Sequence, residues 1–173
     1  MKKWFGISVL VLALDQLSKW IIVKFLAFQT PQHVFPFFNL NYTVNSGAAW
    51  GFLREAGEWK LWLFVSLSLG VSVVIVVWMW RLKPSAIAPC IALPRASLHS
   101  QERVLAAGLS FILGGAVGNL CDRIFNNGLV VDFLQFCYKD HCFPTFNIAD
   151  SAIFIGASLV VLSTFWTSRK PSP

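Results

Sequence analysis

The chain has 173 residues, of which 56% are hydrophobic and 13% charged, and its mean hydropathy is +0.63. Soluble domains carry about 25% charged residues, so this composition predicts a small integral membrane protein of one domain and excludes two large lobes. The net charge of +6 comes from basic residues scattered at the ends of apolar segments, which favours membrane orientation over nucleic-acid binding.

Four apolar segments, each near the ~20 residues that a bilayer requires, predict transmembrane helices over about 4–28, 59–80, 103–122 and 148–168. The first follows two lysines as a signal peptide would, but no small-residue cleavage site follows it, so we interpret it as a retained span. The connection 81–102 contains three prolines and predicts a loop. Its basic residues, with those near both ends of the chain, predict that this loop and both termini are cytoplasmic.

The two remaining segments then face the extracytoplasmic side. Segment 29–58 has aromatic and β-branched runs broken by Pro, Asn and Gly, which predicts a small β or loop element. Segment 123–147 has a turn signal, Asn-Asn-Gly, before the apolar run LVVDFLQF. The fold class is therefore an all-α membrane protein with four transmembrane helices and a small extracytoplasmic β element between the first two.

The four cysteines, Cys90, Cys121, Cys137 and Cys142, lack the paired spacing of a metal site. A disulfide between Cys137 and Cys142 requires their loop to face an oxidising compartment. We expect free thiols.

Two groups of interest occur early in the chain. Asp15 and Lys19 are four residues apart in the first predicted span, so they can pair along one face. Charges inside a membrane usually pair with one another, so a purely structural role is one interpretation. The motif NSGAAWG, residues 45–51, taken alone indicates only a turn of small residues.

The third span ends in GGAVGNLCDR, residues 114–123, whose glycines permit close packing of helices. Asn119, Asp122 and Arg123 are spaced so that all three can face one direction. These three side chains can form a functional group at the lipid–water boundary. In the alternative interpretation they are structural, with an ion pair between Asp122 and Arg123 or between helices.

Three more polar residues lie near the same boundary. Asp132 stands between apolar neighbours in VVDF, so burial is expected to raise its pKa, the alternative being a surface acid on a strand. Asn147 and Asp150 open the last span on one face, although an acid in a first helical turn also simply suits the helix dipole.

The outer ends of the third and fourth spans are joined by one loop, so Asp132 and Asp150 can meet. Two facing carboxylates share a proton, as in aspartic proteases, and can act as base and acid on a water. Such chemistry needs no metal, and the chain contains neither an HExxH nor a GxSxG motif.

Five motifs, DQLSK (15–19), NSGAAWG (45–51), GGAVGNLCDR (114–123), VVDF (130–133) and FNIAD (146–150), resemble in their order the motif series of the lipoprotein signal peptidase, or signal peptidase II, family. The resemblance implies an aspartic endopeptidase of the bacterial inner membrane, without cofactor or metal. It would cleave prolipoproteins before a cysteine bearing diacylglyceryl, near the extracytoplasmic face. The implied partners are these substrates and membrane lipids, with no nucleic acid, and we expect a monomer.

Matched by motif, Asp132 and Asp150 correspond to the catalytic dyad of that family. The resemblance places around substrate and dyad a set of supporting residues: Asn45, Gly47, Asn119, Arg123, Asn147, Asp122, Asp15 and Lys19. Arginine offers always-charged donors to a carbonyl, and asparagine orients carbonyls without adding charge. The chain departs from the common pattern at Trp50, at Cys142 and in the length of loop 81–102, none of which touches the dyad.

Two other classes of function fit paired intramembrane charges. A transporter or proton relay predicts charges through the depth of several helices, whereas the second span contains none between residues 61 and 80. In a lipid-binding or assembly subunit, the charges would only hold the helices together. Cleavage of a lipidated precursor separates both classes from a peptidase.

Overall fold

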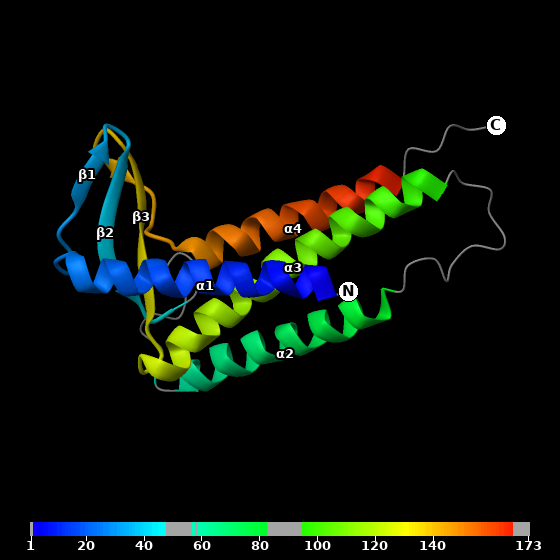
Figure 1. The fold of residues 1–173 in the computed structure, drawn as a ribbon. Helices are drawn as coiled ribbons and strands as arrows, with labels where there is room; N and C mark the ends of the chain where they lie inside the picture. The colour runs from blue at the N-terminus through cyan, green and yellow to red at the C-terminus, as the bar shows by residue number, and fades with distance from the viewer. Residues whose placement is uncertain (1, 48–56, 58, 83–94, 168–173) are drawn as a thin grey trace.

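The computed structural model describes residues 2–47, 57, 59–82 and 95–167. Within them lie four helices long and apolar enough to cross a membrane: α1 (Lys2–Phe25), α2 (Trp59–Arg81), α3 (Arg95–Phe125) and α4 (Ile148–Thr167). Helix α3 packs against the other three, and a small sheet lies at one end of the bundle (Figure 1). The predicted four-helix membrane fold is confirmed.

Helix α3 begins earlier than expected. Residues 95–102, assigned to a loop from the sequence, form its first turns. All three prolines of the connection precede Arg95, and the polar run that follows contains no residue that breaks a helix. The rest of the expected loop, residues 83–94, lies outside the described residues.

The sheet is antiparallel, in the order β1 (Gln32–Phe35), β2 (Phe38–Asn45), β3 (Val130–Tyr138) and β4 (His141–Cys142). Only β1 and β2 come from the connection between the first two helices, where the β element was expected. The segment between α3 and α4 supplies the other two strands, and it pairs Asp132 with Thr43. The sheet therefore joins both outer connections and positions Asp132 at the end of the bundle (Figure 1).

Cys137 and Cys142 form a disulfide, so the expectation of free thiols is wrong for these two residues. They lie directly opposite each other in the β3–β4 hairpin, whose turn contains Lys139 with a positive φ of 52°. The pairing of the strands, which the spacing of cysteines alone does not reveal, brings the two sulfur atoms together. Cys121 is free, and Cys90 lies outside the described residues.

Glycines on α3 allow its neighbours to approach closely. A Cβ atom at Gly118 would lie 2.7 Å from Oδ2 of Asp15 on α1, and one at Gly115 would collide with the backbone oxygen of Ala149 on α4. This confirms the packing role predicted for the glycines. The apolar core lies between α2 and α3, around Ile75, Met79, Leu109 and Leu113.

Candidate active site

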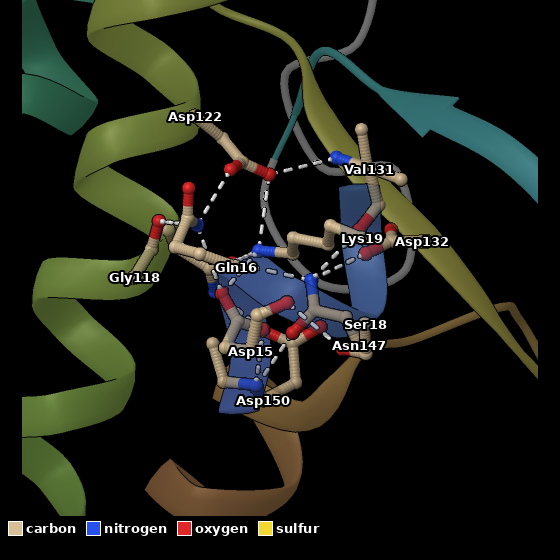
Figure 2. A network of polar contacts seen from close by, with 12 residues as sticks. Asp15, Gln16, Ser18, Lys19, Gly118, Asp122, Val131, Asp132, Asn147 and Asp150 are labelled. Carbon is tan, nitrogen blue, oxygen red and sulfur yellow. Dashed lines mark hydrogen bonds and ion pairs between the residues drawn. The ribbon is translucent and has the colours of Figure 1, made fainter. Parts of the chain in front are cut away.

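Three buried charges join α1 to α3 at the sheet end of the bundle. Nζ of Lys19 lies 2.8 Å from Oδ2 of Asp15 and 3.0 Å from Oδ2 of Asp122 (Figure 2). All three side chains are almost fully buried, and buried charges need such pairing. The predicted Asp15–Lys19 pair is confirmed, and Asp122 takes part in an ion pair between helices. We call Asp15, Lys19 and Asp122 the buried ion cluster.

Gln16 also contacts the buried ion cluster, and this role was not predicted from the sequence. Its Nε2 donates to Oδ1 of Asp122 at 2.9 Å and to the backbone oxygen of Gly118 at 3.1 Å. Gln16 precedes Lys19 by three residues, so the rule that residues three apart share a helix face was the available signal.

The first turn of α4 is capped by two side chains. Oδ1 of Asn147 accepts the backbone N–H of Asp150 at 2.8 Å, and Oδ1 of Asp15 accepts that of Ala149, also at 2.8 Å. N–H groups in the first turn of a helix have no partner within the helix, so these contacts stabilise its start. They hold Asp150 at a defined position beside the sheet.

Asparagine side chains connect the two aspartates. Nδ2 of Asn147 donates to Oδ1 of Asp132 at 2.7 Å and to Oδ1 of Asn119 at 3.1 Å. Nδ2 of Asn119 in turn donates to Oδ1 of Asp150 at 2.7 Å. As expected from the shared loop, Asp132 and Asp150 are brought together, and both line one cavity.

Asp132 is only 2% exposed. Burial raises the pKa of Asp132 to about 7, and the negative charge of Asp150 acts in the same direction. Hydrogen bonds from Asn45 and Asn147 and the charge of Lys19 oppose this rise in the pKa. The burial of the Asp132 carboxyl, expected from the sequence, is confirmed. With this raised pKa, Asp132 and Asp150 can share one proton near neutral pH.

Arg123 lies on another wall of the cavity. Its guanidinium group lies 5.1 Å from the ring centroid of Phe64, a cation–π contact. Nη1 and Nη2 donate to the backbone oxygens of Asn119 and Gly47 at 3.3 and 3.5 Å. Asn45 in turn accepts the N–H of Gly47 at 2.9 Å. Trp50, at which the motif departs from the common pattern, lies outside the described residues.

The cavity has a volume of about 990 Å³. Six of the predicted residues line it: Asn45, Gly47, Asn119, Arg123, Asp132 and Asp150. The buried ion cluster and Asn147 lie behind this lining. A further wall follows α4 into the membrane span at Ile153, Phe154 and Ala157 and is mostly apolar.

Sequence reasoning missed four polar residues of the lining, Gln29, Thr43, Thr145 and Ser151. Thr43 and Thr145 share a hydrogen bond of 2.7 Å between their hydroxyl groups. No motif marks Gln29, Thr43 or Thr145, because the sheet and the connections beside it bring them to the cavity, whereas Ser151 follows Asp150 directly in α4. Among the described residues, no group of three or more His, Cys, Asp or Glu side chains is placed to hold a metal ion.

Four membrane-length helices and a buried carboxylate pair beside one cavity define an integral membrane protein of the aspartic-peptidase type. The family model described as Signal peptidase (SPase) II matches residues 7–166. The chain belongs to the signal peptidase II family, as its motif series predicted.

Similar proteins cover the chain almost completely. It is 42% identical to the lipoprotein signal peptidase of Shewanella loihica, over 98% of this chain and 90% of the relative. It is 40% identical to that of Acinetobacter baylyi, over 96% of this chain and 84% of the relative. A solved structure described as a bacterial membrane enzyme is 27% identical, has a TM-score of 0.77, and covers 100% of this chain and 94% of its own.

Proposed function

We propose that this protein removes signal peptides from prolipoproteins and that Asp132 and Asp150 are its catalytic dyad. Membership of the signal peptidase II family and the names of the similar proteins support the reaction. The observation that carries the residue assignment is that both carboxylates line one cavity, where Asn147 donates to the Asp132 carboxylate and Asn119 donates to the Asp150 carboxylate.

The reaction uses one proton held by the dyad. The ionised carboxylate takes a proton from water, which attacks the scissile carbonyl carbon while the other carboxyl protonates the carbonyl oxygen. The tetrahedral intermediate then breaks its C–N bond as the proton taken from the water passes to the leaving amine, and a hydroxyl proton of the intermediate returns to the second carboxylate, which restores the one-proton dyad. The pKa of Asp132, raised to about 7, keeps this one-proton state populated near neutral pH.

The two ends of the cavity suit the two parts of a lipid-modified substrate. Donors from Arg123 and the asparagines lie beside the dyad and are suited to bind backbone carbonyls. The apolar wall of α4, at Phe154 and Ala157, is suited to the acyl chains of a diacylglyceryl group. Cleavage would therefore occur just before the modified cysteine, at the depth where acyl chains remain in lipid.

Charge and redox chemistry indicate how the protein lies in the membrane. Lys3, Arg81 and Arg103 occur at or near the helix ends that lie away from the sheet, and the positive-inside rule assigns those ends to the cytoplasm. The disulfide of the β3–β4 hairpin fits an oxidising compartment on the sheet side. The site would then face outward from the bacterial inner membrane. We propose that the enzyme acts as a monomer.

The test is cleavage of a purified prolipoprotein in lipid or detergent by Asp132→Asn and Asp150→Asn. We expect each variant to lose about 10³-fold or more in rate while its amount in the membrane is unchanged. Asp140→Asn is the matched control, since Asp140 is an exposed acid in the β3–β4 turn. Normal processing by either dyad variant would overturn the assignment.

The same assay tests the substrate class. A precursor bearing diacylglyceryl on its cysteine should be cleaved, whereas the unmodified precursor should not. Equal rates on the two precursors would contradict a lipid-specific site. Activity should also survive EDTA, because no step of the proposed reaction uses a metal.

A further inference from the structure

We propose that Lys19 is a positioning residue that, with Asp15 and Asp122, clamps together the two chain segments that carry the dyad. The proposal rests on the proposed function of Asp132 and Asp150. It assigns a specific task to charges that touch neither the cavity nor the substrate.

Each acid of the buried ion cluster holds the backbone of the residue immediately before one dyad aspartate. Oδ1 of Asp15 accepts the N–H of Ala149 at 2.8 Å, next to Asp150. Oδ2 of Asp122 accepts the N–H of Val131 at 3.0 Å, next to Asp132 (Figure 2). The start of α4 and strand β3 are therefore each attached to one carboxylate of the cluster.

Lys19 connects these two attachments. Its Nζ donates to Oδ2 of Asp15 at 2.8 Å and to Oδ2 of Asp122 at 3.0 Å. A third contact runs to Oδ1 of Asn119 at 3.1 Å. An ammonium group has three donors and no acceptor, so these three contacts use its full capacity. With a side chain only 4% exposed, Lys19 has little room to exchange these partners for water.

The third contact also sets the orientation of the Asn119 amide. Lys19 and Asn147 both approach Oδ1 of Asn119 with donors, each at 3.1 Å. The amide therefore turns its Nδ2 the other way, where it donates to Asp150 at 2.7 Å. Reversing the amide would place an NH₂ group against two donors and remove the contact to Asp150.

The cluster also contributes to the electric field at the dyad. The charged groups that interact with the dyad are Lys19 and Asp15 from α1 and Arg123 from α3, and Asp122 lies next to Lys19, 3.0 Å from its Nζ. Strand β2 has no charged residue, and β3 and α4 contain only the dyad acids themselves. The positive charge of Lys19 lowers the pKa of Asp132. Its removal should raise this pKa further, so that the dyad keeps its shared proton to higher pH and the alkaline limb of the activity profile moves to higher pH.

Two variants separate the contact from the charge. The cluster carries a net charge of about −1 from two carboxylates and one ammonium, and Lys19→Met changes this to about −2. The double variant Lys19→Met with Asp122→Asn restores about −1, while the donor to Asn119 stays absent. Lys24→Met is the matched control, because Lys24 lies on the same helix but is exposed, 4.7 Å from the ring centroid of Trp20.

We expect Lys19→Met to lower kcat by about 10²-fold per folded molecule, as small displacements of catalytic groups do, with a smaller change in KM. Its alkaline limb should move to higher pH. The double variant should keep the low kcat, with its alkaline limb near the wild-type position. Lys24→Met should behave as wild type. The folded fraction of each variant, measured by circular dichroism and thermal unfolding, normalises the rates.

The positioning role would be overturned if both Lys19 variants had the wild-type kcat per folded molecule and an unmoved alkaline limb. Asp132→Asn and Asp150→Asn, assayed in parallel, distinguish this outcome from failure of the proposed function. If those variants are inactive and the Lys19 variants are fully active, only the clamp is wrong. If the dyad variants cleave normally, the proposed function itself fails.

Discussion

Asn147 donates a 2.7 Å hydrogen bond from its Nδ2 to Oδ1 of Asp132, while its Oδ1 caps the helix that carries Asp150. One fully buried side chain thus contacts a strand and begins a helix. A capping residue usually contributes only to helix stability. Here it also sets the relation between the two proposed catalytic acids.

Asn147→Ala should weaken both functions of this side chain. Loss of the cap costs about 1 kcal/mol, and loss of the hydrogen bond to Asp132 raises the pKa of that carboxyl further. We expect the cleavage rate to fall by about 10²-fold, since the acids lose their fixed geometry. Ser158→Ala is the control, because Ser158 is half-buried on the same helix, away from the cavity lining, and donates to the backbone oxygen of Phe154 in its own helical turn. Equal cleavage rates in the two variants would contradict this role of Asn147.

The stability of the protein should depend on pH through Asp132. Its pKa is about 7 when folded, against an ordinary 3.8, so between these values the folded state binds more protons than the unfolded state. Stability should therefore fall as the pH rises from about 4 to 7, and level off above, by about 1.4 kcal/mol for each pH unit crossed.

Unfolding in detergent at pH 5 and pH 8 tests this dependence. Asp132→Asn carries no titratable carboxyl at this position and should lose less stability between the two pH values than the wild type. Asp140→Asn, at the exposed turn, should keep the wild-type difference. If the free energies of unfolding of wild type and Asp132→Asn change in parallel, another group causes the dependence.

Gly118→Ala should disturb the buried ion cluster. The added Cβ would lie 2.7 Å from Oδ2 of Asp15, which also bonds Lys19, so the carboxylate must move. We expect a lower thermal unfolding temperature and slower cleavage. Gly70→Ala on α2 provides the comparison, because nothing lies within 4 Å of its Cβ position, and alanine favours a helix by about 1 kcal/mol. A Gly118→Ala variant as stable and active as Gly70→Ala would refute this close packing.

The disulfide should support one rim of the cavity. Residues 143–146 follow Cys142 directly and line the cavity, and the N–H of Phe143 donates to the backbone oxygen of Phe136 at 2.7 Å. Cys137→Ser with Cys142→Ser should lower stability by about 2 kcal/mol and raise KM more than it lowers kcat. Cys121→Ser, at a free thiol, is the control. Alkylation without reductant should label Cys121 but neither Cys137 nor Cys142.

Much of this architecture follows from local sequence. An apolar run of about 20 residues can satisfy its backbone in lipid only as a helix, so all four spans were predictable. The Asp15–Lys19 pair was predictable as well, because residues four apart meet on any helix. Asp132 and Asp150 were singled out because acids beside apolar runs are costly to bury.

Other features depend on contacts between distant segments. Strand β2 pairs with β3 across 89 residues, Thr43 with Asp132, and this pairing exists only once the helices bring both outer connections to one end. The disulfide follows from the same hairpin. The attachment of Asp15 to Ala149 and of Asp122 to Val131 has no local signal either.

Composition and spacing thus determined the spans and the acids within or beside them, because these follow from the cost of polar groups in lipid. Tertiary packing decided which backbone groups those acids hold, because hydrogen bonds between segments depend on distances that no single segment encodes.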